Sequence, residues 1–204
     1  TQCGCADIMM HTMERYFVLE DTMEITDKIA QDVMKNVIKY AKILKKDPEN
    51  YEARAEIMWC GSLSHNGLTG CGTCGGDWAT HLIEHELGGM FDVAHGAGLA
   101  AVWGSWARYV MDEKPERFAQ FAVDVMGVEE SDDVKSTALK GIEAVEEFYR
   151  MIEMPTNMKE LGINPTDEQI KDMAMKATNH DTQQLGAFKK LSAKDLVEIY
   201  KTAK

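Results

Sequence analysis

The sequence has no long apolar run, and this absence excludes a membrane-spanning helix. Its longest weakly polar stretch, residues 98–111, is too short to cross a bilayer and contains Arg108. Basic residues are also scarce, because 22 lysines and arginines face 34 aspartates and glutamates, for a formal net charge of −12. Such a charge repels phosphate groups, so we expect neither nucleic acid nor an anionic membrane as a partner.

The sequence also lacks an export signal. Residues 1–4 carry neither an initiator methionine nor the charged-then-apolar pattern of a secretory leader. Five cysteines, an odd number, without such a leader predict reduced thiols in a cytoplasmic protein rather than a disulfide framework. We expect one domain over 1–204, since 45% hydrophobic residues in a chain of this length can form a buried core.

A sustained alternation of apolar and polar residues, which would indicate strands, is missing as well. The apolar residues instead recur with the spacing of helices. Over 24–46, apolar residues recur every three or four positions, and lysines gather in the last turn. Asp47-Pro48 predicts the start of a helix over 49–65. Further helices are expected over 77–87, closed by Gly88-Gly89, over 96–111, from Pro115, and from a Ser131 cap to about residue 154.

The last third of the chain carries two capping-box signatures, which mark helix starts. Thr166 with Gln169 and Ser192 with Asp195 have the required spacing. We therefore assign the fold class as all-α, a multi-helix domain with eight or more helices. The last third holds few groups suited to chemistry and is expected to be a packing shell of amphipathic helices.

Residues suited to chemistry gather around the glycines. Four of the six histidines lie in the region that holds 11 of the 16 glycines. There His81 and His85 are four apart on one helix face, and His95 follows after a turn; Asp7 and His11, also four apart, form a second pair. A carboxylate with three imidazoles suits a divalent ion such as Fe(II) or Zn(II), whereas a lone Asp–His pair is most often a hydrogen-bonded surface pair.

Other motifs compete for these residues. The letters from His81 to His85 fit the H-x-x-E-H pattern of inverted zinc proteases, in which Glu84 would activate water. That interpretation leaves His95 and the Asp7–His11 pair unexplained. The stretch 70–75 fits the letters of a dinucleotide fingerprint, but no βαβ unit surrounds it, so we reject that interpretation.

The cysteines offer a further alternative. Cys3 with Cys5 and Cys71 with Cys74 could form a four-thiolate zinc or iron–sulfur site. Their spacing is irregular, and small buried thiols are the default interpretation.

Several of these motifs occur together, in order, in a known family. They are Ala6-Asp7-x3-His11-x2-Glu14-x-Tyr16, Asn66-Gly67-Leu68, Gly76-Asp77-Trp78-Ala79-Thr80-His81, His85-Glu86-Leu87 and Ala94-His95-Gly96. Across residues 6–98 the chain resembles the iron-containing alcohol dehydrogenase family, and within it the butanol dehydrogenase branch. The cysteine-rich loop departs from the family pattern.

The resemblance implies a fold and a set of site residues. It identifies the chain with the C-terminal helical domain, of the dehydroquinate synthase-like α type, and implies that the N-terminal nucleotide-binding domain, with its Gly-Gly-Gly-Ser loop, is absent from this chain. Asp7, His11, His81 and His95 fall on the four metal ligands. His85 falls on the cofactor-binding histidine beside the nicotinamide, to which we assign a catalytic role in proton relay or positioning.

The resemblance also implies an activity: NAD(P)H-dependent interconversion of aldehydes and primary alcohols by hydride transfer. A divalent metal, Fe2+ or Zn2+, would polarise the substrate oxygen as a Lewis acid. The partners expected are a small alcohol or aldehyde and the nucleotide-binding domain, and a homodimer is left open. Without that domain the chain is expected to be inactive. The alternative is a non-catalytic helical metal-binding module or a proteolytic core.

Overall fold

The computed structural model describes residues 1–20 and 24–204. Within them the chain forms nine α-helices, two short 3-10 helices and no strand, which confirms the all-α prediction. The elements are α1 (Gln2–Tyr16), α2 (Glu24–Lys46), α3 (Tyr51–His65), η1 (Leu68–Gly70), α4 (Ala79–Phe91), α5 (His95–Val110), η2 (Met111–Glu113), α6 (Pro115–Asp124), α7 (Val134–Met151), α8 (Asp167–Ala177) and α9 (Ala193–Thr202). None of the described helices combines the length and apolar composition that a bilayer span requires.

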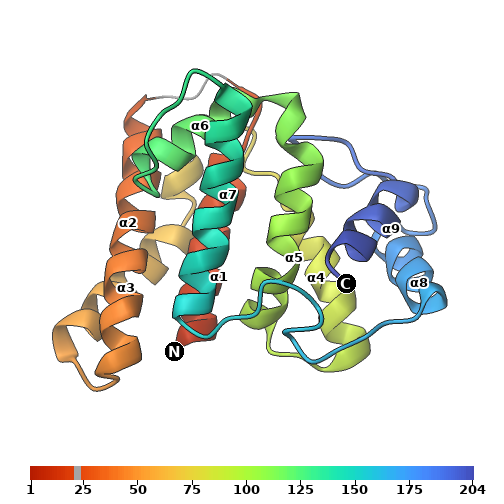
Figure 1. Cartoon of the computed structure of the whole chain (residues 1–204), viewed down its shortest axis with the longest axis horizontal. Helices are drawn as coiled ribbons and strands as arrows, with labels where there is room; N and C mark the ends of the chain where they lie inside the picture. The colour runs from red at the N-terminus through yellow and green to blue at the C-terminus, as the bar shows by residue number, and fades with distance from the viewer. Residues whose placement is uncertain (21–23) are drawn as a thin grey trace.

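Helix α1 is the central element of the fold (Figure 1). It packs against α2 and α3 on one side and against α5 on the other. Helices α8 and α9 pack against each other and cover α4 and α5 at the far end of the molecule. This arrangement places α1, α4 and the start of α5, which carry the predicted site residues, next to one another.

Two predicted boundaries in the first half are wrong. Helix α3 is capped by Asn50, whose side chain accepts a hydrogen bond from the backbone N–H of Ala53 at 3.0 Å, so Asp47-Pro48 lies before the helix rather than at its start. Helix α4 continues through Gly88-Gly89 to Phe91. Met90 and Phe91 pack against the core, and this burial outweighs the cost of about 1 kcal/mol for each glycine in a helix.

The start of α7 also differs from the prediction. Asp133, not Ser131, caps it by accepting from the backbone N–H of Lys135 at 3.1 Å, while Ser131 donates to the carbonyl of Asp133. The helix ends at Met151, a turn earlier than expected. Asp133 takes the cap because it lies directly before the first helical residue.

Both predicted capping boxes are confirmed. At α8, the Thr166 side chain accepts a hydrogen bond from the backbone N–H of Gln169 at 3.2 Å. The Gln169 side chain in turn accepts from the backbone N–H of Thr166 at 2.8 Å. Ser192 and Asp195 form the same reciprocal pair at α9. These two helices are therefore fixed by local sequence as well as by burial.

Aromatic packing fixes the C-terminal end of α1 in the core. Phe17 is fully buried and stacks on Phe118, with ring centroids 4.3 Å apart. It also contacts Trp103 and Trp106 of α5, both 1% exposed. Because large aromatic rings contribute much of the burial energy of a core, this cluster holds α1 firmly against α5 and α6.

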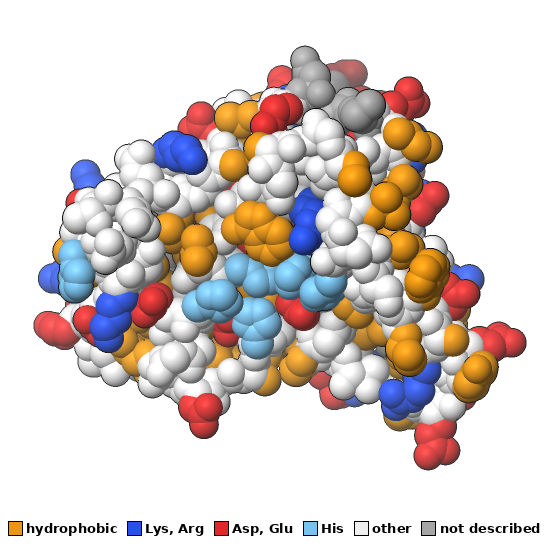
Figure 2. All heavy atoms as spheres, turned by 180° about the vertical axis from the view of Figure 1, so that it is seen from behind, with side chains coloured by type: hydrophobic (Ala, Val, Ile, Leu, Met, Phe, Trp, Pro, Cys, Tyr) orange, Lys and Arg blue, Asp and Glu red, His pale blue; other side chains and the backbone are white. Residues whose placement is uncertain are grey.

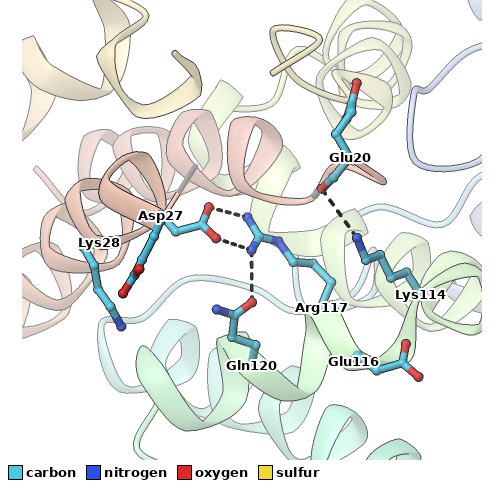
Figure 3. Close-up of a pocket in the computed structure, with 8 residues that line it drawn as sticks. Glu20, Asp27, Lys28, Lys114, Glu116, Arg117 and Gln120 are labelled. Atoms are coloured by element: carbon cyan, nitrogen blue, oxygen red, sulfur yellow. Dashed lines mark hydrogen bonds and ion pairs between the residues drawn. The ribbon is translucent and has the colours of Figure 1, made fainter. Parts of the chain in front are cut away.

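A buried charged residue joins the same end of α1 to α2 and α6. The guanidinium of Arg117 donates to both carboxylate oxygens of Asp27, at 2.6 and 2.7 Å (Figure 3). The same group donates to the backbone carbonyl of Tyr16. It also lies 3.6 Å from the centroid of the Tyr16 ring. Arg117 is 4% exposed, so this bidentate pairing is what makes its burial tolerable.

Asp77 joins the start of α4 to a segment far along the chain. Its Oδ1 accepts from the backbone N–H of Ala79, and its Oδ2 accepts from those of Ala187 and Phe188, both at 2.7 Å. Burial raises the pKa of Asp77 to about 6, while the three N–H donors act in the opposite direction and favour the carboxylate. This one side chain therefore orients α4 relative to the 185–191 segment.

Replacing Asp77 with Ala is expected to lower the free energy of unfolding by about 2–4 kcal/mol, because it leaves several backbone N–H groups without an acceptor in the interior. Urea denaturation followed by circular dichroism measures the change. Asp32→Ala, at an exposed position on α2, is the matched control and should change stability little. Equal stability of the two variants would contradict the role given to Asp77.

Candidate metal centre

The predicted site residues converge on one face of the molecule. Asp7 and His11 lie one turn apart on α1, His81 and His85 one turn apart on α4, and His95 is the first residue of α5. Figure 2 shows histidine side chains gathered in the middle of this face. The four-residue spacings in the sequence thus place each pair on the face that meets the other helices.

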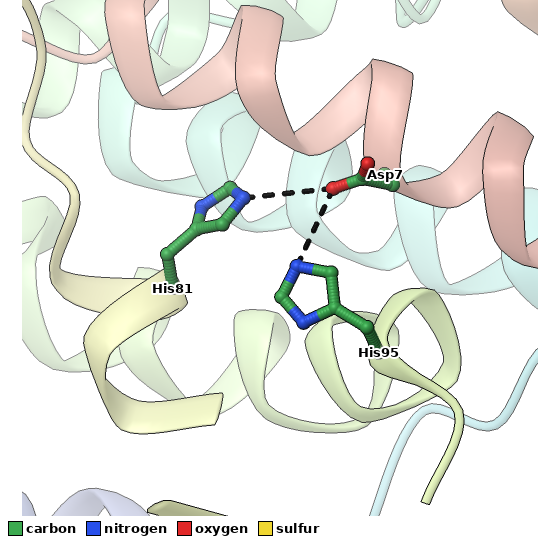
Figure 4. A group of neighbouring side chains, drawn as sticks. All are labelled: Asp7, His81 and His95. Atoms are coloured by element: carbon green, nitrogen blue, oxygen red, sulfur yellow. Dashed lines mark ion pairs between the residues drawn. The ribbon is translucent and has the colours of Figure 1, made fainter. Parts of the chain in front are cut away.

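One oxygen of Asp7 is the common point of this cluster. Asp7 Oδ1 lies 3.6 Å from Nε2 of His11, of His81 and of His95 (Figure 4 shows the last two). These separations exceed hydrogen-bond length. Two ligands each about 2.1 Å from a tetrahedral ion lie about 3.4 Å apart, so the spacing fits donors that share one cation.

Buried polar atoms without hydrogen-bond partners also indicate a cation at this site. Asp7 Oδ1 and His81 Nε2 are buried and have no hydrogen-bond partner in the structure. Buried polar atoms in native proteins are nearly always satisfied, so two of them facing each other require an explanation. A positive ion bound between them would satisfy both.

Two buried glutamates orient the histidine rings. Glu14 Oε1 accepts from Nδ1 of His81 at 3.2 Å and from the His81 backbone N–H at 3.0 Å. Glu84 Oε2 pairs with Nδ1 of His95. Since a carboxylate accepts but does not donate, each Nδ1 carries a hydrogen, and Nε2, which has a free lone pair when the ring is neutral, faces Asp7. This is the usual carboxylate–histidine support of a metal ligand.

The charges of the site act on one another. Burial raises the pKa of Asp7, but its histidine neighbours outweigh this effect and hold that pKa below its ordinary value. Burial lowers the pKa of His81, yet the neighbouring Asp7 and Glu14 carboxylates raise it to about 9, so a metal ion bound at Nε2 would displace a proton. Burial, with His81 next, lowers the pKa of His11 to about 4. His11 is therefore neutral at pH 7, the form in which an imidazole binds metal.

The structure arranges the donors into overlapping groups. Ligand atoms of Asp7, His81 and His95 lie within 4.8 Å of one another, and so do those of Asp7, His11 and His65; a third such group, Glu84, His85 and His95, does not include Asp7. The other three predicted ligands thus surround Asp7, and His65, at the end of α3, joins them. His65 was not among the predicted site residues.

His85 lies beside the cluster rather than inside it. Its ring centroid is 5.6 Å from that of His95 and 6.3 Å from that of His81, and the side chain is exposed. Burial of part of the ring, with His95 next, lowers its pKa below the ordinary value. A neutral, accessible imidazole next to the candidate ligands is suited to proton transfer or to contact with a bound molecule.

Trp78 forms a wall of the site in a costly backbone conformation. Its φ of 63° is in the left-handed region, which bulky residues rarely adopt. The indole lies edge-on to His11 and His81, with centroids 5.3 Å from each, and the Arg15 guanidinium lies 4.6 Å from its centroid. Strain of this kind is concentrated at functional sites.

The competing motifs fit the structure less well. Glu84, which a zinc protease of the H-x-x-E-H type would use to activate water, is 1% exposed and is already paired with His95. None of the three candidate metal groups found in residues 1–20 and 24–204 contains a cysteine, and all five cysteines are free thiols. Burial raises the pKa of Cys5 and of Cys60 to about 11, which makes both poor metal ligands.

Comparison with known proteins decides the family. A sequence model of the Fe-containing alcohol dehydrogenase family, C-terminal, matches residues 1–204. The chain belongs to the iron-containing alcohol dehydrogenase family. NADH-dependent butanol dehydrogenase A of Clostridium acetobutylicum is 33% identical to it over 202 residues, which are 98% of this chain and 51% of that protein. The probable NADH-dependent butanol dehydrogenase 1 of Bacillus subtilis is 35% identical over 201 residues, with the same coverage.

Solved structures of the iron-containing alcohol dehydrogenase family share this fold. NADH-dependent butanol dehydrogenase A from Thermotoga maritima matches with a TM-score of 0.91 and 33% identity, covering all of this chain and 52% of that one. The aldehyde reductase YqhD of Escherichia coli matches with a TM-score of 0.92 and 28% identity over the same shares. The chain spans about half the length of the curated relatives it matches.

Replacing Glu14 with Ala is expected to weaken metal binding about 10- to 100-fold, because His81 then loses the partner that fixes its ring and its tautomer. Isothermal titration of the metal-free protein with Zn2+ measures the change. The matched control is Glu86→Ala, a carboxylate on α4 that is in none of the candidate metal groups. An unchanged affinity in the Glu14 variant would show that this carboxylate does not support the site.

Proposed function

We propose that this chain is the metal-bearing domain of an NAD(P)-dependent alcohol dehydrogenase that interconverts aldehydes and primary alcohols. The observation that carries the proposal is the position of Asp7 Oδ1, which lies equally far from three imidazole nitrogens in a chain of this family. The names of its relatives, butanol dehydrogenases and aldehyde reductases that use NADH or NADPH, support the substrate class and the cofactor.

Each residue of the site has a proposed role. Asp7, His11, His81 and His95 would hold the divalent ion, Fe2+ or Zn2+, which when bound supplies a Lewis acid for the substrate oxygen. Glu14 and Glu84 keep the rings of His81 and His95 oriented, with Nε2 directed at Asp7. Trp78 shields the His11 and His81 side of the cluster.

His85 is proposed as the residue that relays a proton or positions the nicotinamide. It is exposed, next to His95, and is not in either group of donors that includes Asp7. The nicotinamide would be presented by a nucleotide-binding domain, which in this proposal occupies the part of the relatives that this chain does not span. Two expectations from the sequence remain predictions: that the protein forms a homodimer and that it is located in the cytoplasm.

The test is a comparison of the 204-residue chain with a polypeptide that also carries the nucleotide-binding domain. The longer protein should reduce butanal with NADH or NADPH, lose this activity to a chelator and regain it with Fe2+ or Zn2+. The 204-residue chain should bind the metal but leave butanal unreduced. Full activity after complete metal removal would refute the proposal, and metal binding without activity in either protein would favour a non-catalytic metal-binding module.

A further inference from the structure

Trp78 gives the candidate metal centre an apolar border. Its ring centroid lies 5.3 Å from those of His11 and His81, and the residue is only partly buried. Trp103 and Trp106, by contrast, are 1% exposed and belong to the core. Figure 2 shows hydrophobic surface next to the gathered histidines on this face. A molecule that reaches the histidines from solvent therefore meets an indole beside them.

The indole of Trp78 is held in place by several partners. Its N–H donates to the carbonyl of Gly75 at 2.9 Å, and the Arg15 guanidinium lies over the ring, 4.6 Å from the centroid. Arg15 is itself fixed, because its Nη1 donates to the carbonyls of His11 and Ser64 at 3.1 and 2.7 Å. Partners from α1, from the end of α3 and from the loop before α4 thus hold the ring as a rigid wall.

The backbone that carries Trp78 is fixed as well. The N–H of Asp77 donates to the carbonyl of Glu14 on α1 at 2.8 Å. Gly76 has a φ of 118°, and a Cβ at this position would lie 2.8 Å from Nε1 of Trp78, so a glycine is needed here for the indole to take its place. With the left-handed φ of Trp78 itself, these contacts leave the ring little freedom to swing aside.

The histidines of the site have different neighbours at their two ends. The ring of His81 neighbours those of His11 and His95, with centroids 4.5 and 5.5 Å away. Trp78 borders His11 and His81, whereas His85 borders His81 and His95. In the proposed function the nicotinamide lies at His85. The carbon chain of a substrate whose oxygen approaches the ligands is then left with the apolar surface at the other end, which is the indole.

We propose that Trp78 determines the substrate specificity of this site. The carbon chain of the aldehyde or alcohol lies against the indole, and a chain that branches beside the carbonyl carbon does not fit there. The proposal rests on the proposed function for the metal and for the carbonyl chemistry. The wall is selective because its hydrogen bond to Gly75 and its contact with Arg15 prevent it from moving away from a bulkier substrate.

The charge behind the wall narrows the substrate class further. Arg15 places a permanent positive charge against the indole, and this charge disfavours a cationic substrate chain. An apolar ring on the substrate side offers no partner for a chain with several hydroxyl groups, whose desolvation would then be unfavourable. The substrate class that fits is therefore the uncharged, unbranched aliphatic aldehydes and their primary alcohols.

The experiment uses the polypeptide that also carries the nucleotide-binding domain, loaded with the metal that restores its activity. We compare kcat/KM for butanal and for 2-ethylbutanal, which branches beside the carbonyl carbon. Trp78→Ala is expected to raise KM for butanal about 10-fold with kcat little changed, and to lower the preference for butanal about 10- to 100-fold. Trp78→Phe, with its smaller ring, should give an intermediate preference. Trp59→Ala, at a 62% exposed position on α3, is the matched control and should keep the parent's preference.

Two binding measurements separate contact with the substrate from support of the metal. Butyramide is an uncharged amide that resembles butanal and is not reduced. Calorimetry should show that it binds the metal-loaded longer protein about tenfold more weakly in Trp78→Ala than in the parent. Zn2+ titration of the 204-residue chain should give the same affinity for the parent and for Trp78→Ala, because an indole N–H donates hydrogen bonds and supplies no metal ligand.

The possible outcomes separate this proposal from the proposed function. An unchanged preference in both Trp78 variants overturns the proposal and leaves the proposed function intact. A changed preference with weakened Zn2+ binding, or with unchanged butyramide binding, also overturns it, because Trp78 then acts on the metal site and not on the substrate. If circular dichroism shows that Trp78→Ala does not fold, Trp78→Phe alone decides. A parent protein that does not reduce butanal with Fe2+ or with Zn2+ refutes both proposals.

Discussion

Asp7→Ala is expected to leave the protein without tightly bound metal. Its Oδ1 is the one atom that lies 3.6 Å from Nε2 of His11, His81 and His95, and its carboxylate is the anionic member of the predicted ligand set. Without it, three imidazoles remain, of which His81 is held in place by Glu14 alone. Losing a partly buried charged ligand costs about 3–5 kcal/mol, so the affinity should fall by a factor of about 10² to 4 × 10³.

Elemental analysis after dialysis, together with a Zn2+ titration, measures the loss. Asp32→Ala, at an exposed site on α2, controls for the removal of one negative charge. Circular dichroism should show the same helical content in both variants, because Asp7 Oδ1 has no hydrogen-bond partner and Oδ2 lies 3.6 Å from His65 Nε2, beyond hydrogen-bond length. Stoichiometric metal in Asp7→Ala would remove the basis of the proposed function.

His85→Ala is expected to lower turnover about 10²- to 10⁴-fold in the enzyme that includes the nucleotide-binding domain, with metal content unchanged. The reason is the position of His85. The centroid of its ring lies 5.6 Å from that of His95, and the residue is outside the donor groups that contain Asp7. Its pKa is lowered, which favours the neutral imidazole. A residue of this kind contributes to proton transfer or cofactor contact without holding the metal.

Two measurements give this result its meaning. Metal content separates a lost ligand from a lost catalytic group, and the pH profile of turnover should lose the ionisation of His85. His180→Ala, which removes an exposed histidine outside the cluster, should match the parent enzyme in both. Unchanged turnover in His85→Ala would refute its assigned role, and loss of metal would make it a ligand.

The sequence predicts helices well where the signal is local. The capping boxes at Thr166 and Ser192 are present as expected, because each depends on atoms three residues apart. The end of α4 was missed because a glycine pair normally ends a helix, whereas here the burial of Met90 and Phe91 carries it onward. The burial of Met90 and Phe91 depends on which elements pack against the end of α4, and local sequence signals do not predict that packing.

The same limit applies to the site. Four-residue spacing places Asp7 with His11 and His81 with His85 on shared helix faces, so these pairs can be found without a structure. The contacts of Glu14 with His81 and of His65 with Asp7 join residues more than fifty positions apart, through the packing of α3 on α1 and of α5 on both α1 and α4. Glu14 does follow Asp7 by seven residues, two helical turns on the same face, which is the one local signal for its role.

The bonds from Asp77 to Ala187 and Phe188 have a consequence for biosynthesis. Asp77 sets the start of α4, and α4 carries His81, so the geometry of the metal centre depends on residues translated 110 positions after Asp77. While the ribosome is making the intervening helices, Asp7 and His81 are both already in the nascent chain, but Asp77 still lacks two of its three backbone N–H donors. We therefore expect tight metal loading to be a late event of folding, completed only after residue 188 has emerged from the exit tunnel.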